Sequence, residues 1–361
     1  MNGIDMKRIG LTERLVQESR IYEGLVIGRV SSQYKDLYKV ITEAGELTAE
    51  ISGKFRYQVT ALAEYPAVGD FVMVDRTDNS KGNGVIHHVL KRKSAFTRKV
   101  AGAATDTQIV AANIDTVFIC MSLNNDFNLR RLERYLSIAW DSGATPVVVL
   151  TKSDLCQDTE AKLKDVSSMA IGVDVLVTTS TSDDGYLPVK GYIAWGQTAA
   201  FIGSSGVGKS TLINRLIGKN IFDTNGIRND DRGRHTTTRR DLVMLPEGGT
   251  VIDTPGMREL GIISADLSKS FADIDELAHK CKFGDCTHGS EPDCAVQRAI
   301  NNGILTAERL ESYNKLKKEA RYDGLNSKQI EREKINEMFS GMGGLKNARK
   351  FIKDKNRSKN R

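Results

Sequence analysis

The chain has 361 residues, of which 40% are hydrophobic and 27% charged, and its formal net charge is +6. This length and composition are ordinary for a globular protein with two or three domains, each large enough to have a core. No apolar run approaches the roughly 18 residues needed to cross a bilayer. Residues 1–20 also contain no apolar stretch of signal-peptide length. These observations exclude a membrane-spanning protein, and we expect a cytoplasmic one.

The positive charge is concentrated in one short segment. Between Lys346 and Arg361, eight basic residues stand against a single acidic residue, Asp354, so this segment carries more than the whole net charge. A short polar segment of this kind cannot bury enough surface to fold alone, and it attracts polyanions. The sequence therefore favours a nucleic-acid partner, with a merely solubilising tail as the alternative.

Residues 1–20 are predicted to be an N-terminal extension, and residues 21–95 a small β-barrel. Alternating apolar runs, separated by Gly, Asp and Asn, predict strands over residues 22–30, 36–45, 46–52, 68–75 and 85–92. Short strands with turns between them suit an OB-fold, although an SH3-like barrel would give much the same pattern. Residues 96–113 are expected to be a linker.

From residue 114 to residue 262 the pattern changes to an alternation of strands and helices. Near-continuous apolar strands are expected around residues 115–122, 147–151, 173–178, 198–202, 241–245 and 250–253. Such strands are typical of a parallel sheet covered on both faces, so we predict an α/β domain. Residues 263–340 are predicted to be helical, and glycines at 341, 343 and 344 to lead into the basic tail at 341–361.

A phosphate-binding motif lies between a predicted strand and a predicted helix. The pattern GxxxxGKS is matched by Gly203, Ser204, Ser205, Gly206, Val207, Gly208, Lys209 and Ser210, and Thr211 follows. Glycines let the backbone approach phosphate oxygens closely, and the helix adds its positive end. Lys209 is expected to reach the β- and γ-phosphates, and the Ser210 hydroxyl to bind Mg²⁺. The alternative is a glycine-rich turn without a ligand.

The sequence DTPG follows a second apolar strand. Asp253 is expected to hold Mg²⁺ through water, and the N–H of Gly256 to meet the γ-phosphate. The long polar segment between the two motifs contains three adjacent threonines, one of which could complete the Mg²⁺ shell while a γ-phosphate is present. Thr237 or Thr238 is the candidate. A structural turn for DTPG and a solvated loop for the polar segment are the alternatives.

A second motif is suited to reading a guanine base, and it consists of Thr151, Lys152, Ser153 and Asp154. Guanine presents two adjacent donors that one carboxylate accepts, whereas adenine would leave that carboxylate unpaired; such sites reject the wrong analogue by roughly 10⁴–10⁵. Lys152 is expected to lay its methylene stem along the base. Thr151 stands where Asn is more common. Residues 178–180, TTS, sit where a second base-contacting loop belongs, although a plain strand end is equally consistent.

The order of these motifs is inverted. In ordinary GTPases the base-reading motif follows the phosphate loop, whereas here TKSD precedes it. The inversion predicts a circularly permuted P-loop GTPase domain over residues 114–262. GTP or GDP, together with Mg²⁺, is the expected ligand.

A cluster of metal-ligand residues lies in the predicted helical region. Cys281, Cys286, His288 and Cys294 fall within fourteen residues. Three thiolates and one imidazole make a closed tetrahedral shell for one structural Zn²⁺, and clustered cysteines in a reducing compartment are more often metal ligands than disulfides. His279 is a rival ligand, and reduced, unliganded cysteines are the alternative. Cys120 and Cys156 lie in or beside apolar segments and are expected to be packing residues.

With the barrel, the motif order TKSD, TTS, GSSGVGKS, HTTT and DTPG, and the cysteine cluster in view, the chain closely resembles the ribosome small-subunit-dependent GTPase A family (RsgA). The resemblance covers residues 20–325. It implies an OB-fold, a permuted GTPase domain and a zinc-bearing helical domain. It also implies binding to the small (30S) ribosomal subunit and its 16S-type rRNA late in maturation, with GTP hydrolysis stimulated by that subunit. It implies nothing about the tail.

The expected catalytic residues are Lys209, Thr237 and His235. Ras-type enzymes place a glutamine directly after the motif matched by DTPG, but Met257 occupies that position here and cannot polarise water. Slow intrinsic turnover is therefore expected. His235 matches the switch histidine that the resemblance assigns to orienting water, and a surface histidine without a catalytic role is the alternative.

Two other functions fit parts of the sequence. One is a P-loop ATPase or kinase in which TKSD is coincidental, and the other is an RNA-binding assembly scaffold that holds nucleotide with little turnover. Basic residues of the barrel could follow an RNA backbone, although such charge is common on any solvated edge; they are Lys91, Arg92, Lys93, Arg98 and Lys99. We expect a monomer that does not bind membranes.

Overall fold

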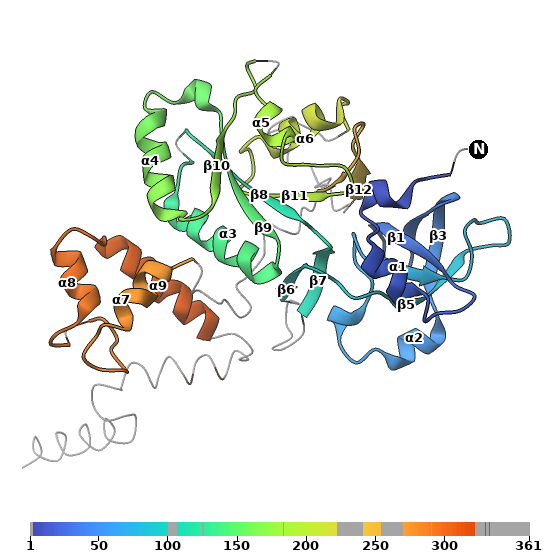
Figure 1. The fold of residues 1–361 in the computed structure, drawn as a ribbon, viewed down its shortest axis with the longest axis horizontal. Helices are drawn as coiled ribbons and strands as arrows, with labels where there is room; N and C mark the ends of the chain where they lie inside the picture. The colour runs from blue at the N-terminus through green and yellow to red at the C-terminus, as the bar shows by residue number, and fades with distance from the viewer. Residues whose placement is uncertain are drawn as a thin grey trace, which may run out of the picture.

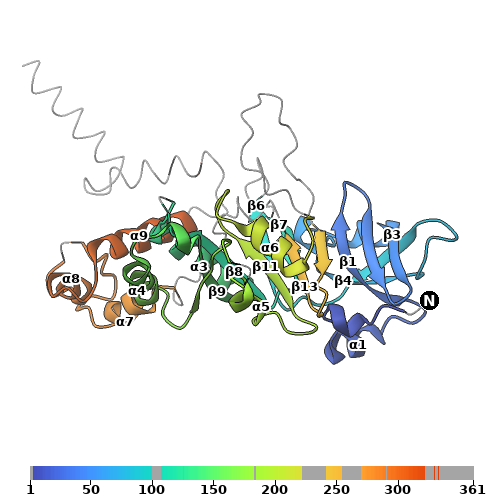
Figure 2. The same cartoon turned by 90° about the horizontal axis from the view of Figure 1, so that it is seen from above.

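The structure is a computed structural model, and it describes residues 3–99, 107–124, 126–182, 184–221, 241–253, 270–289 and 291–321, with the single positions 329 and 332. Three parts follow one another along the longest axis (Figures 1 and 2). A β-barrel lies at one end, an α/β domain in the middle and a small helical domain at the other end. The helices in the described part of the chain lack the combination of length and apolar character that crossing a membrane requires.

The barrel is an OB-fold, as predicted. Its strands are β1 (Val26–Gln33), β2 (Tyr38–Thr42), β3 (Gly45–Ile51), β4 (Phe71–Val74) and β5 (Gly84–Val89). They are ordered β1-β2-β3-β5-β4, with β3 parallel to β5, and β4 pairs back onto β1 to close the barrel. Alternate residues of these strands fill the interior, including Val30, Val40, Leu47, Val72 and Ile86. A short helix, α2 (Gly53–Gln58), and the turn η2 (Leu62–Glu64) connect β3 to β4.

The α/β domain contains a parallel sheet in the order β10-β9-β8-β11-β13, and β12 is added antiparallel beside β13. Its strands are β8 (Thr116–Ser122), β9 (Thr145–Thr151), β10 (Asp174–Val177), β11 (Thr198–Ile202), β12 (Asp241–Met244) and β13 (Thr250–Asp253). The strands on one side of β11 all precede it in the chain, and those on the other side all follow it. This is the arrangement that the inverted motif order predicts for a permuted domain.

Helices cover both faces of this sheet because successive strand residues point to opposite sides. Val117, Ile119 and Met121 pack with α3 (Leu129–Ser142) and α4 (Thr159–Met169) in one core cluster. Phe118 and Cys120 pack on the other face with α5 (Leu187–Lys190) and α6 (Lys209–Ile217). Nearly every residue of β8 is therefore buried, as expected for a central strand.

The helical domain consists of α7 (Ala272–Ala278), α8 (Ala295–Asn301) and α9 (Ala307–Arg321) in the described part of residues 270–321. Its apolar residues, among them Phe271, Ile274, Val296 and Leu310, belong to the same core cluster as α3 and α4. The cysteine-rich loop joins α7 to α8 at the far end of the molecule (Figure 1).

The barrel and the α/β domain share one continuous sheet, since β12 pairs antiparallel with β1 through Ser32 and Asp241. Arg29 of β1 is fully buried at this junction. Its guanidinium donates to the carbonyl of Gly69 at 3.2 Å, to the hydroxyl of Thr198 at 2.9 Å and to the carbonyl of Ile9. Burial lowers the pKa of Arg29 to about 10. A buried cation surrounded by acceptors from separate segments fixes how those segments meet.

Two segments differ from the sequence-based expectation, while the exact domain boundaries stay predictions. The predicted extension, residues 1–20, forms η1 (Met6–Ile9) and α1 (Glu13–Ser19), and its residues Ile9 and Leu15 are buried in the main core. The predicted linker, residues 96–113, contains most of a two-stranded sheet of β6 (Ala95–Lys99) and β7 (Thr107–Ala112). Residues 109–112 are buried against the barrel and α/β domains, so burial rather than turn composition decides their conformation.

Candidate nucleotide site and metal centre

The phosphate loop connects β11 to α6, as its sequence predicts. Gly203, Gly206 and Gly208 all have positive φ angles, of 142°, 76° and 98°. At Gly203 a Cβ would overlap the carbonyl oxygen of Cys120 on β8, so this position requires glycine for space as well as for conformation. Lys209 is 8% exposed, and its Nζ donates to the carbonyls of Gly203 at 2.7 Å and Ser204 at 2.6 Å. The loop therefore surrounds the ammonium group of Lys209, and this group would bind the phosphate oxygens.

The carboxyl ends of the parallel strands bring the predicted site residues to one edge of the sheet. Ile119 of β8 is paired with Ile202 of β11, directly before the phosphate loop, and Ser122 of β8 is paired with Thr151 of β9. Asp253 ends β13, which pairs in parallel with β11 on its other side. Ser210 and Thr211 lie in the first turn of α6. The two sequence motifs and the acidic strand end thus share one edge.

Thr151 joins the base-reading motif to the phosphate loop directly. It is 5% exposed, and its hydroxyl donates to the carbonyl of Val207 at 2.6 Å. Its own carbonyl accepts a hydrogen bond from the N–H of Leu123 at 2.9 Å, which holds the strand end in place. The threonine that replaces the more common asparagine therefore ties two loops together, a contact that the sequence did not predict.

Asp154 lies at the open side of this site, in the short turn η3 (Ser153–Leu155) that follows Lys152. Lys152 has a φ of 58°, which turns the chain sharply after β9. The carboxylate of Asp154 is exposed and accepts a hydrogen bond from the hydroxyl of Thr179 at 2.6 Å. The N–H of Ser153 reaches the carbonyl of Thr178 at 3.3 Å. The TTS segment is thus the neighbour of Asp154, and Thr179 orients the carboxylate that would read a base.

We expect Thr151→Val to weaken GDP binding by about five- to thirtyfold. The substitution keeps the shape of the side chain but leaves the Val207 carbonyl without its donor, which costs roughly 1–2 kcal/mol of loop organisation. Titration calorimetry with GDP measures the effect. Thr178→Val is the matched control, because within the described residues the hydroxyl of that buried threonine reaches the strand carbonyl of Leu150, at 3.4 Å, and not the phosphate loop. Equal GDP affinities of the two variants would contradict a role for the tie.

Several predicted residues lie outside the described part of the chain. These are the catalytic candidates His235 and Thr237, the DTPG glycine Gly256, Met257 and the basic tail from Lys346 to Arg361. Their roles stay predictions.

The four predicted metal ligands converge on one point in the loop between α7 and α8. The ligand atoms of Cys281, Cys286, His288 and Cys294 all lie within 4.8 Å of one another. The Sγ atoms of Cys281 and Cys294 are 3.9 Å apart, and each is 3.6–3.7 Å from Nδ1 of His288. A tetrahedral Zn²⁺ with ordinary bond lengths requires ligand separations of roughly 3.5–3.8 Å. The separations among Cys281, His288 and Cys294 are close to these values, and with Cys286 the cluster can hold a metal ion of the kind that three thiolates and an imidazole suit, such as zinc.

The surroundings of the cluster orient its ligands. Cys294 caps α8, since its Sγ accepts from the N–H of Gln297 at 3.4 Å, and the Gln297 side chain donates to the carbonyl of His288 at 2.5 Å. Burial opposes ionisation of Cys281, but the backbone N–H groups at the start of α8 and the thiols of Cys294 and Cys286 together outweigh it, so the pKa of this thiol is lowered. Burial raises the pKa of Cys286 to about 11 and lowers the pKa of His288. A neutral imidazole is the form that binds a metal.

The rival histidine and the other cysteines are not part of this cluster. Nδ1 of His279 is 2.7 Å from the carbonyl of Asp275 in its own helix, and the side chain is exposed. Cys120 is buried beneath the phosphate loop, and burial raises its thiol pKa to about 12. Cys156 is half-buried against the core cluster on the other face of the sheet, the one that contains residues of α3 and α4.

The basic strip of the barrel is less available than its sequence suggests. Arg92 forms an ion pair with the buried carboxylate of Asp70 at 2.7 Å and donates to two backbone carbonyls. Lys93 forms an ion pair with Asp115, and Arg98 donates to Gln108 at 3.2 Å. These cations therefore take part in intramolecular contacts, which the spacing of charges along a sequence does not reveal.

Comparisons with known proteins agree with this geometry. Residues 89–263 match the family described as RsgA GTPase. A second match, to the family described as ABC transporter, spans residues 187–340, which include the phosphate loop but not TKSD. The chain is 50% identical over 344 residues to the small ribosomal subunit biogenesis GTPase RsgA 2 of Lactiplantibacillus plantarum, covering 95% of this chain and 97% of that protein.

Two solved structures have a similar fold. The crystal structure of YjeQ from Thermotoga maritima superposes with a TM-score of 0.62 at 29% identity, covering 82% of this chain and 98% of that one. YloQ, described as a circularly permuted GTPase, superposes with a TM-score of 0.57 over 83% of this chain and 96% of that one. At 24% identity the second likeness concerns the fold alone.

Proposed function

The chain belongs to the RsgA GTPase family, and we propose that it hydrolyses GTP while bound to the small ribosomal subunit late in the assembly of that subunit. The relatives are named for small ribosomal subunit biogenesis, and this partner comes to the present chain from those names. A cytoplasmic location follows from the proposed partner. Binding to 16S-type rRNA and action as a monomer are part of the same proposal.

The observation that carries the proposal is the hydrogen bond from Thr151 to the Val207 carbonyl. It puts the end of the base-reading motif against the phosphate loop, so one nucleotide can contact both. A P-loop ATPase or kinase has no need for a carboxylate at the position of Asp154, because adenine would leave that group unpaired. The geometry therefore supports guanine nucleotides over adenine nucleotides.

In the proposed reaction, this chain's residues bind and orient the substrate. Lys209 and the loop N–H groups hold the phosphates, Asp154 selects the base, and Ser210 and Asp253 are the residues that would hold Mg²⁺. That ion would neutralise charge developing on the phosphate oxygens. His235 and Thr237 are proposed to orient the attacking water and to complete the site. The cysteine and histidine cluster is proposed to hold one structural zinc ion.

We expect the purified chain to hydrolyse GTP slowly alone and roughly 10- to 100-fold faster when small ribosomal subunits are added. The reason is Met257, which cannot orient water where Ras-type enzymes have glutamine. Phosphate release measures turnover, with large subunits as the partner control and Lys209→Ala as the variant that loses phosphate binding.

Competition by ATP completes this experiment. If an excess of ATP competes for the site as strongly as an equal excess of GTP does, the ATPase or kinase alternative is favoured. Tight GTP binding without turnover, even when small subunits are present, would favour the scaffold alternative.

A further inference from the structure

A buried polar cluster joins the GTPase domain to the helical domain. Glu133 of α3 is 4% exposed, although it is a charged residue on a helix of the GTPase domain. One carboxylate oxygen accepts from Nη1 of Arg309 at 2.8 Å, and the other accepts from the hydroxyl of Ser312. Both partners belong to α9. Burial raises the pKa of Glu133, and the hydrogen bonds to Ser312 and Arg309 oppose that effect.

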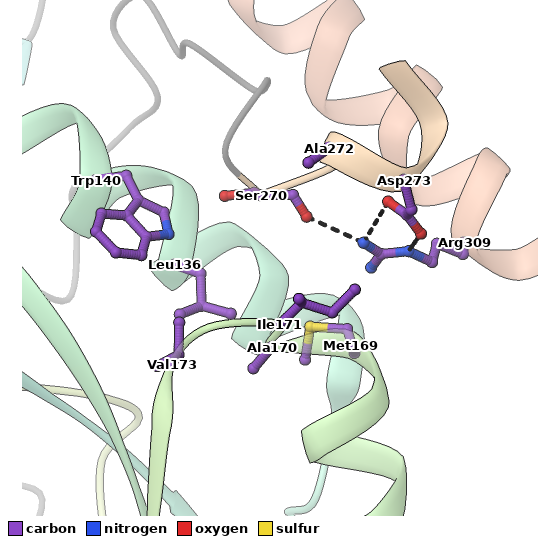
Figure 3. Close-up of a pocket in the computed structure, with 10 residues that line it drawn as sticks. All are labelled: Leu136, Trp140, Met169, Ala170, Ile171, Val173, Ser270, Ala272, Asp273 and Arg309. Atoms are coloured by element: carbon purple, nitrogen blue, oxygen red, sulfur yellow. Dashed lines mark hydrogen bonds and ion pairs between the residues drawn. The ribbon is translucent and has the colours of Figure 1, made fainter. Parts of the chain in front are cut away.

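Arg309 is the centre of this cluster, and Figure 3 shows how its guanidinium reaches the start of α7. It contacts Asp273 through two nitrogens, at 2.6 and 2.8 Å, and donates to the carbonyl of Ser270 at 3.0 Å. Its guanidinium carbon also lies 4.9 Å from the ring centroid of Phe271, which is fully buried. The Arg309 side chain, which belongs to α9, therefore contacts α3 and the residues at the start of α7 at the same time.

The apolar part of the same interface is incompletely filled. A hollow of about 20 Å³ lies beside Arg309, lined by Leu136 of α3, by Met169 and Val173 near the end of α4, and by Ala272 of α7 (Figure 3). A space of this size holds about one water molecule. Beside the apolar core that the two domains share, the polar contacts of Arg309 therefore add a directional link between them at this point.

The energetics of the cluster point to positioning rather than to stability. One guanidinium faces two carboxylates, Glu133 and Asp273, and its side chain is only 12% exposed. Desolvation of buried ion pairs consumes much of their attraction, so apolar replacements are often as stable. What such a cluster provides is a defined geometry, because its hydrogen bonds have directions that apolar contacts lack.

This geometry connects to the nucleotide site through α3. Helix α3 packs directly on β8 and β9, whose ends carry the contacts to Gly203 and to the phosphate loop. Ser270, just before α7, is held from both sides of the interface, because the Ser137 hydroxyl of α3 donates to its hydroxyl at 3.1 Å and Arg309 donates to its carbonyl. A displacement of the helical domain would therefore act on α3 and, through it, on the ends of β8 and β9.

We propose that Arg309 is a positioning residue for GTP hydrolysis. Through its contacts with Glu133 and Ser270, it couples the binding of a partner at the helical domain to the conformation of the GTPase domain. The inference rests on the proposed function, since it assumes that small-subunit binding stimulates turnover. The described side-chain contacts of Arg309 are to Glu133, Ser270, Phe271 and Asp273, outside the predicted nucleotide site, so its removal should separate stimulated turnover from basal turnover.

The test compares full-length Arg309→Met with the parent chain. We expect stimulated turnover to fall about tenfold, while basal turnover, GDP affinity and metal content stay within about twofold of the parent. Glu133→Gln, which keeps the shape of the carboxylate and removes its charge, should lower stimulated turnover in the same direction by about threefold. Arg309→Lys should restore only part of the stimulation, because an ammonium cannot contact two oxygens of Asp273 as a planar fork does.

The matched control is Arg130→Met, because Arg130 pairs with Glu311 across the same two helices at 2.8 Å but in solvent. It should behave like the parent. Parental stimulation in folded Arg309→Met and Glu133→Gln would overturn the proposal, and if Arg309→Met loses its metal, Glu133→Gln decides alone.

If small subunits fail to stimulate the parent, the proposed function fails, and hydrogen exchange tests the positioning role separately. Amides of residues 271–278 should exchange differently with GDP and with a non-hydrolysable GTP analogue in the parent, and equally in Arg309→Met. Equal exchange in the parent would refute the positioning role.

Discussion

Asp154→Asn is expected to lower the preference for GDP over ADP by roughly 10³-fold or more. The carboxylate can accept two hydrogen bonds from the adjacent donors of guanine, whereas the amide offers one acceptor and one donor. Thr179 holds the carboxylate at 2.6 Å in the orientation that meets a base beside the phosphate loop. The ratio of GDP and ADP dissociation constants, measured by competition with a fluorescent nucleotide, reports the change.

The same substitution at Asp158 is the matched control. Asp158 lies four positions further along the chain, and its carboxylate caps α4 by accepting from the N–H of Ala161 at 2.9 Å. Asparagine caps a helix equally well, so Asp158→Asn should leave both nucleotide affinities and stability unchanged. The affinity of Asp154→Asn for xanthosine diphosphate gives a further test, since the 2-oxo group of this nucleotide can accept a hydrogen bond from the asparagine amide. An unchanged GDP to ADP ratio in Asp154→Asn would remove Asp154 from base recognition.

Removal of the proposed zinc ion is expected to unfold the helical domain while leaving the barrel and the GTPase domain folded. Structural zinc sites contribute about 10 kcal/mol or more to the folding of small domains. The described part of this domain has three helices of modest length, and the cluster fixes the loop between α7 and α8 and the first turn of α8. A chelator should therefore abolish hydrogen-exchange protection in residues 295–316, with GDP affinity within a few-fold of the untreated chain.

Single thiol substitutions separate the cluster from the other cysteines. Cys286→Ser should reduce zinc content well below one ion per chain and lower the melting temperature of the helical domain. Cys156→Ser is the control, because that thiol is half-buried outside the cluster. Full protection of α8 and α9 in a chain shown by metal analysis to be zinc-free would refute a structural role for the metal.

The sequence by itself determined the features that are encoded locally. The phosphate loop, the TKSD motif and the metal ligands each occupy a short segment, and their residue types and spacing are visible without any fold. The alternation of apolar residues likewise predicted the barrel strands, and near-continuous apolar runs predicted the strands β8 to β13, because a strand covered on one face alternates and a strand covered on both faces does not. The inverted order of two motifs was enough to predict a permuted domain, which the order of the sheet confirms.

Only the tertiary structure decided how these segments meet. The tie between Thr151 and Val207, the burial of Arg29 and the cluster around Arg309 join residues that lie far apart in the chain. Residues 1–20 and 96–113 lack a strong apolar period, and in their described parts, 3–20, 96–99 and 107–113, a neighbouring surface covers residues such as Ile9, Leu15, Val110 and Ala111. Periodicity reports only which side of an element is apolar, whereas register and packing between elements decide which polar groups face one another.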